Sequence, residues 1–147
     1  MSLTTTAPSA ARSASRGFVR YLPILGRILL GLPMIIFGLN SFFNFIPPPP
    51  TPLPDGAVAF AGALVESGYM MPLIGVTQLL VGTLLLLNRF VPLALILLAP
   101  FLVNSVLFHL MLEPSGLPPA LVFTALTLAL AWHHRRAYAP LFVARFR

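Results

Sequence analysis

The fold is decided first by residues 21–45, which read YLPILGRILLGLPMIIFGLNSFFNF. Arg27 is the single charged residue in this stretch, and the stretch exceeds the roughly 20 apolar residues that a helix needs to cross a bilayer. Three further apolar stretches follow, at residues 70–87, 91–112 and 117–132. With 58% apolar and only 8% charged residues, the chain is unlike a soluble domain. The composition therefore predicts an all-α membrane protein with four transmembrane helices.

The arginines indicate how these helices are oriented. Every arginine outside the apolar stretches lies before the first, between the second and third, or after the fourth. These residues are Arg12, Arg16, Arg20, Arg89, Arg135, Arg136, Arg145 and Arg147. The two remaining connections, residues 46–69 and 113–116, contain no basic residue. Because basic residues stay on the cytoplasmic side of membrane helices, we expect a four-transmembrane-helix antiparallel bundle with both termini in the cytoplasm.

The chain divides into three expected segments. These are a flexible cytoplasmic tail over residues 1–16, a membrane domain over residues 17–141 and a basic cytoplasmic C-terminus over residues 142–147. The formal charge of +6 follows from the topology, so nucleic acid is not an expected partner. The absence of cysteine excludes disulfides, thiolate metal sites and covalently attached haem. His133 and His134 are adjacent and project in different directions, so no metal site is predicted.

Glycines at regular spacing indicate how the first two membrane helices pack. Gly31 and Gly38 are seven residues apart, and so are Gly75 and Gly82. Small residues at this spacing let two membrane helices approach closely at a left-handed crossing. We predict that the two helices pack face to face through these four glycines, with Gln78 on the same side. The alternative is that they reflect only the general abundance of glycine in membrane helices.

The first outer connection begins with the proline-rich run at residues 46–54. Such a run favours polyproline II and cannot be helical. After it, Asp55 is expected to cap a short helix over residues 56–67, which Gly68 ends. Its apolar residues suit a helix that lies at the outer interface or is packed onto the bundle.

Arg27 is the strongest candidate for a functional residue inside the membrane, because the hydrocarbon region contains no water to solvate a charged group. Asp55, Glu66 and Glu113 are all on the outer side, so no carboxylate is expected at its depth. Three alternatives remain. The side chain reaches the cytoplasmic headgroups, it donates to helix carbonyls freed by Pro33, or it binds an anion or carbonyl from a lipid, a quinone or a partner subunit.

A second polar group is expected in the outer half of the membrane. Its members are Asn40, Gln78, Asn104 and His109, with Glu66 and Glu113 at the border. Together they could line one outward-opening cavity, in which the imidazole would be the proton carrier or the partner of a quinone oxygen. The alternative is that the amides link helices to one another and that the imidazole simply reaches water.

Several short motifs recur in order along the chain. They are GRILLG at residues 26–31, GLN at 38–40, ESGYMMPLIGVTQ at 66–78, GTLLLLNRFVPLA at 82–94, NSVLFH at 104–109 and EPSG at 113–116. In this order and spacing they resemble the DoxX family of small four-helix membrane proteins over residues 17–141. An acidic residue is common in related sequences where Gln78 stands here, which argues against a role that needs a carboxylate at that position.

The resemblance implies a bacterial or archaeal cytoplasmic (inner) membrane and, for some relatives, quinone-linked oxidation or a membrane redox assembly. We therefore expect an accessory or small subunit of such an assembly, which has protein partners or forms a homo-oligomer. Quinone is the candidate cofactor. The chain is not expected to be catalytic on its own. The alternatives are a non-catalytic structural or assembly subunit of a larger membrane complex, and a small-ligand binding protein or carrier.

Overall fold

The computed structural model describes residues 9–143, with side chains from Tyr21 onward, and every regular element among these residues is helical. Of the two expected terminal segments, residues 1–8 and 144–147 lie outside the described residues. The elements are α1 (Ser9–Phe43), α2 (Asp55–Glu66), α3 (Met70–Leu86), α4 (Val91–Met111), η1 (Pro114–Gly116), α5 (Leu117–His133), α6 (Arg135–Tyr138) and η2 (Ala139–Phe142). Helix α1 includes residues 9–16, because that segment contains no glycine or proline to interrupt it.

Three helical segments are long and apolar enough to cross a membrane. They are residues Tyr21–Phe43 of α1, all of α4, and Pro114–His133, with mean hydropathies of 2.0, 2.3 and 1.5. Helix α3 has 17 residues and is therefore about 26 Å long, slightly less than a typical hydrocarbon core. It meets the same test only together with α2, to which it is joined at a bend of 89°.

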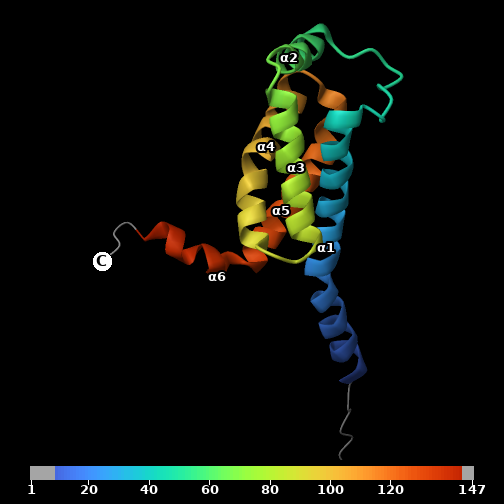
Figure 1. Ribbon diagram of the computed structural model, residues 1–147. Coiled ribbons are helices and arrows are strands. Elements are labelled where there is room, and N and C mark those ends of the chain that lie inside the picture. The colour runs from blue at the N-terminus through green and yellow to red at the C-terminus, as the bar shows by residue number, and fades with distance from the viewer. Residues whose placement is uncertain (1–8, 144–147) are drawn as a thin grey trace, which may run out of the picture.

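Four helices pack side by side around a shared apolar core. Helix α1 contacts α3 and α5, and α4 contacts the same two helices, so the contacts among the four form a closed ring. Figure 1 shows the four helices running side by side. The largest fully buried side chains are Leu30 and Met34 of α1, Val81 and Leu85 of α3, and Leu98 of α4. Figure 1 also shows α2 lying across one end of these helices and α6 projecting away from the other end.

The contact between α1 and α3 brings the two backbones together at four glycines. A Cβ atom added to Gly82 would lie 2.8 Å from the carbonyl oxygen of Gly31, and one added to Gly38 would lie 3.0 Å from that of Gly75. The glycines are therefore paired, Gly31 with Gly82 and Gly38 with Gly75. Because an ordinary Cβ does not come within 3.0 Å of another heavy atom, the spacing between the two helices depends on glycine at these positions.

Helix α2 is packed onto the bundle against α3 and α4. Ala57 is fully buried, and the rings of Phe60 and Phe108 lie 5.5 Å apart. The expectation that Asp55 caps this helix is wrong, because Pro54 is the N-cap residue and no side chain caps the helix. Asp55 is instead its first residue, where a carboxylate still interacts favourably with the helix dipole. Gly68 follows the helix with a φ of 74°, as expected for a terminating glycine.

The glycine contact generates a direct test of how α1 and α3 pack. We expect Gly82→Ala to destabilise the protein by about 1–3 kcal/mol, the usual cost of overpacking, because the new methyl group meets the backbone of Gly31. Gly62→Ala is the matched control, since a Cβ at Gly62 has no neighbour within 4 Å. The control should be neutral or stabilising by about 0.5–1 kcal/mol. Unfolding in detergent measures both, and equal stability of the two variants would contradict the backbone contact.

Candidate functional site

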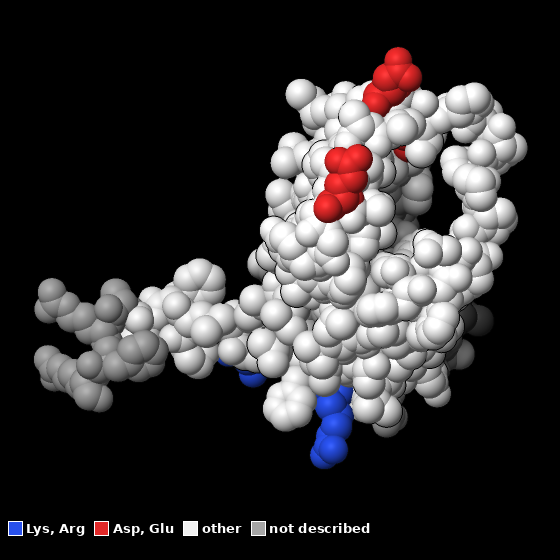
Figure 2. Space-filling model, turned by 45° about the horizontal axis from the view of Figure 1, so that its top comes forward, with Lys and Arg blue, Asp and Glu red and all other residues white. Residues whose placement is uncertain are grey.

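The charged side chains of the described residues separate to opposite ends of the helices. Figure 2 shows acidic side chains at the end that carries α2 and basic side chains at the opposite end. The acidic residues are Asp55, Glu66 and Glu113, and the basic ones are Arg27, Arg89, Arg135 and Arg136. We refer to these as the acidic end and the basic end.

Arg27 finds its partner at the basic end. Its Nη1 donates a hydrogen bond to the side-chain oxygen of Asn88, in the turn between α3 and α4. Asn88 has a φ of 54°, which asparagine tolerates better than most residues. A neutral amide of the same chain thus receives the charge, a partner that the sequence analysis did not consider. The sequence did contain an indication of this contact. Asn88 directly precedes Arg89, in the connection between the second and third apolar stretches, which the Arg27 side chain can reach.

Asn40 completes the end of α1 and lines neither of the cavities described below. Its side-chain oxygen accepts a hydrogen bond from the backbone nitrogen of Ile46 at 2.7 Å. Its backbone oxygen accepts another from the nitrogen of Asn44 at 2.9 Å. Asn40 therefore provides hydrogen-bond partners for backbone N–H groups where α1 ends and the proline-rich connection begins. This structural role accounts for the amide at this position without a ligand.

Gln78 and Asn104 line a groove between α2, α3 and α4, which we call the outer groove. Its volume is about 830 Å³. It is lined by Phe60, Ala61, Leu64, Val65, Met70, Met71, Leu73, Ile74, Thr77, Gln78, Leu97, Leu98, Pro100, Phe101, Asn104, Ser105 and Phe108. Gln78 is only 5% exposed, and its side-chain oxygen has no hydrogen-bond partner among the described residues. The hydroxyl of Thr77 is already bonded to the carbonyl of Leu73 at 2.8 Å.

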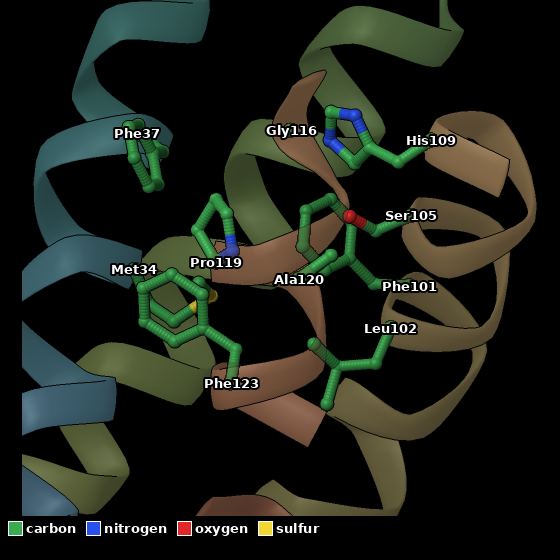
Figure 3. Close-up of a pocket in the computed structure, with 10 residues that line it drawn as sticks. All are labelled: Met34, Phe37, Phe101, Leu102, Ser105, His109, Gly116, Pro119, Ala120 and Phe123. Carbon is green, nitrogen blue, oxygen red and sulfur yellow. The ribbon is translucent and has the colours of Figure 1, made fainter. Parts of the chain in front are cut away.

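His109 lines a different and smaller space between α1, α4 and α5, which we call the small cavity (Figure 3). Its volume is about 250 Å³, and its walls are largely aromatic and apolar. Phe101 and Ser105 of α4 line both spaces and lie between them. The polar residues expected to share one cavity are thus divided, because Asn104 and His109 are five positions apart and face directions about 140° different on a helix.

Glu113 holds His109 in place at the acidic end. Nδ1 of His109 lies 2.9 Å from Oε2 of Glu113 and 3.0 Å from the backbone oxygen of the same residue. The carboxylate also accepts hydrogen bonds from the hydroxyl of Ser115 and from the backbone nitrogens of Ser115 and Gly116. The i, i+4 spacing of His109 and Glu113 is the sequence signal for this pair, and the sequence analysis missed it.

These contacts determine the pKa of the Glu113 carboxyl. The residue is only 9% exposed. The hydrogen bond from the Ser115 side chain lowers the pKa of the Glu113 carboxyl from its ordinary value of 4.5. The backbone N–H of Gly116 and the His109 side chain act in the same direction, while burial opposes them. The carboxylate form is therefore the one that the connection between α4 and α5 stabilises.

The family model for DoxX matches residues 22–111, well over half of the chain, so the chain belongs to the DoxX family. The matched region contains the whole outer groove and His109, whereas Glu113 and α5 follow it. No curated protein and no solved structure matches the sequence.

The contact of Arg27 with Asn88 predicts different effects for two substitutions in the same turn. Asn88→Gly keeps the backbone conformation but removes the acceptor, and we expect it to destabilise the protein by about 0.5–1.5 kcal/mol. Asn88→Asp retains the acceptor and adds a charge opposite to that of Arg27, so it should be as stable as the wild type or more so. The difference in unfolding free energy between the two variants should change once Arg27→Leu is added, because Arg27 can then no longer favour the aspartate at that position, and a difference of unchanged size would exclude the pairing.

The contacts of Glu113 predict a pH dependence of stability. A carboxyl whose pKa is lower in the folded state stabilises the protein fully above its unfolded-state pKa, and this contribution is lost as pH falls through the folded-state pKa. We therefore expect the thermal midpoint in detergent to fall below about pH 4.5, and to fall less in Glu113→Gln. Glu66→Gln, at an exposed position of α2, is the control. An identical acid profile for wild type and Glu113→Gln would refute this account.

Proposed function

We propose that this DoxX-family protein is an accessory subunit of a membrane redox assembly that binds a quinone-type amphiphile in the outer groove. On this proposal it is not catalytic on its own, and electrons come from a partner protein. Helices α1, α3, α4 and α5 are its four antiparallel membrane spans. Both termini are in the cytoplasm of a bacterial or archaeal cell, so the outer groove lies on the far side of the cytoplasmic membrane.

The separation of charge supports this orientation. Arg27, Arg89 and the pair Arg135–Arg136 are at the basic end, and the three acidic residues are at the other. Since Lys and Arg concentrate on the cytoplasmic side of membrane proteins, the basic end is the cytoplasmic one. Helix α3 is short for a span, and the bend into α2 lets α2 cover the outer end of the groove.

The unpartnered side-chain oxygen of Gln78 is the observation that carries the ligand proposal. A buried polar atom without a hydrogen bond costs about 1–3 kcal/mol, and the cost is not recovered within the described residues. A ligand that donates a hydrogen bond to this atom would recover it. Asn104, exposed on α4 and lining the same groove, provides a second amide. A mostly apolar groove with a few convergent polar groups is the usual form of a small-molecule site.

The residues of the groove fit a quinone or its reduced form. The hydroxyl of a quinol could donate to the oxygen of Gln78, and the amide nitrogens of Gln78 and Asn104 could donate to a quinone carbonyl. Phe60, Phe101 and Phe108 provide aromatic surface for a ring, and the aliphatic residues around them suit an apolar tail. A bound quinone supplies two-electron transfer, while these residues only bind it, orient it and exclude water. His109 takes no part here, because it lines the small cavity.

A second candidate is a structural subunit that holds a larger complex together. Helix α6 and η2 favour it, since they project from the basic end (Figure 1). Phe142 of η2 is 85% exposed, and Trp132 at the end of α5 is 72% exposed. This surface suits a protein partner at the cytoplasmic membrane face. It is compatible with the accessory role and does not explain the buried amide of Gln78.

The test is the quinone content of the protein when it is gently extracted from its own membranes. We expect Gln78→Leu to lower the bound quinone about tenfold, which corresponds to about 1.4 kcal/mol. Thr83→Val is the matched control, because Thr83 is exposed on α3 outside the groove. Native mass spectrometry and solvent extraction measure protein partners and quinone together.

Stability separates a binding role of Gln78 from a structural one. If the amide serves a ligand, the ligand-free Gln78→Leu protein should be as stable as the wild type or more so, because an unpartnered polar atom has been removed. A variant that is destabilised and retains its quinone would contradict the proposal. So would a wild-type preparation that contains neither a quinone nor a redox partner.

A further inference from the structure

The small cavity contains a histidine whose proton position can be deduced from its partners. Nδ1 of His109 lies within hydrogen-bond distance of two atoms, the backbone oxygen and a carboxylate oxygen of Glu113. A carbonyl and a carboxylate only accept hydrogen bonds, so Nδ1 is the protonated nitrogen. In the neutral ring Nε2 is therefore the acceptor. Neither Glu113 nor any other described residue is bonded to Nε2.

Gly116 fixes the position of this ring. A Cβ atom there would lie on top of Nδ1 and Cε1 of His109, so one edge of the imidazole rests directly against the backbone of η1. Nε2 is the next ring atom after Cε1, and Figure 3 shows it on the side of the ring that faces the cavity. Figure 3 shows the ring at the outer end of the cavity, across from Phe37 and Pro119.

The rest of the cavity suits a flat aromatic molecule. Ser105 is one helical turn before His109 on α4, and Figure 3 shows its hydroxyl oxygen on the cavity side. Phe37, Phe101 and Phe123 come from three different helices and provide aromatic walls. The volume of about 250 Å³ exceeds that of a cavity of about 150 Å³ that binds benzene. The polar atoms lie at the outer end and the apolar walls surround the remainder.

We propose that the small cavity is a binding site for a phenol-type molecule, distinct from the outer groove. The phenolic hydroxyl donates a hydrogen bond to Nε2 of His109, and the ring lies between Phe37, Phe101 and Phe123. Glu113 is a positioning residue, since it acts on the ligand only by holding Nδ1–H, which makes Nε2 the acceptor in the neutral ring. Such a ring is either a free small phenol or the hydroxylated head of a larger lipid-soluble molecule, and the chemistry of recognition is the same for both.

The experiment compares two probes that differ only at the hydroxyl. Binding of 4-fluorophenol and 4-fluoroanisole to the full chain in nanodiscs is followed by ¹⁹F NMR, with empty nanodiscs correcting for partition into lipid. We expect the phenol to bind about tenfold more tightly, since a methyl ether cannot donate the hydrogen bond to Nε2. His109→Phe should abolish this preference, whereas His133→Phe, which changes an exposed histidine, should leave it intact.

A second readout does not depend on how well the variants fold. In ¹⁵N-labelled wild-type protein, the signal of the unprotonated nitrogen of His109 should shift when 4-fluorophenol is added and should not shift with 4-fluoroanisole. Equal binding of the two probes, or an unchanged signal of this nitrogen, would overturn the proposal.

Competition identifies the source of the ring and separates this site from the outer groove. Displacement of 4-fluorophenol by a hydroquinone with a long alkyl tail assigns the site to the head of a lipid-soluble molecule. A lack of displacement assigns it to a free phenol. Gln78→Leu should leave the phenol preference unchanged, so the two proposals can fail independently.

Discussion

The close approach of two backbones, α1 against α3, is the contact on which the other features depend. With Gly31 against Gly82 and Gly38 against Gly75, the register of these helices is fixed to within a turn. That register places Arg27 at the level of the turn that follows α3, where Asn88 receives its guanidinium. It also buries the face of α3 on which Gln78 lies between two glycines. The bilayer core has no water to hydrogen-bond a polar group that lacks a protein partner. A change in the register would therefore leave polar groups such as Arg27 without their partners.

Helix α4 separates the polar residues near the acidic end of the bundle into two groups. Gln78 and Asn104 lie on the side of α4 that faces α2 and α3, and His109 lies on the side that faces α1 and α5. The residues between them, Phe101 and Ser105, belong to both sides. The outer groove therefore has amides that can donate or accept, whereas the small cavity has an imidazole whose Nδ1 lies against Glu113. The two spaces differ in the polar groups that line them.

The sequence was most informative where one helix or one pair of helices determines the result. Apart from the start of α1, which lies at Ser9 instead of residue 21, the helix bounds lie within two residues of the expected apolar stretches. Helix α2 differs by one residue at each end. The agreement arises because hydrophobicity, proline and glycine act locally. The partner of Arg27 and the division of the polar residues could not be predicted in this way. They depend on how far each helix is rotated about its axis, which is decided by packing between α1, α3, α4 and α5 rather than by any one stretch.

The bend between α2 and α3 determines how a molecule can reach the outer groove. Phe60, Leu64 and Val65 of α2 lie over its outer end, and neither α1 nor α5 contributes to its lining. In the membrane orientation proposed above, the remaining approach is sideways, from between the lipid chains. An amphiphile that enters by this route is first concentrated in the bilayer, so its occupancy follows its mole fraction among the lipids and not its concentration in water. Two molecules with equal contacts in the groove would then differ in occupancy simply because one dissolves better in the membrane.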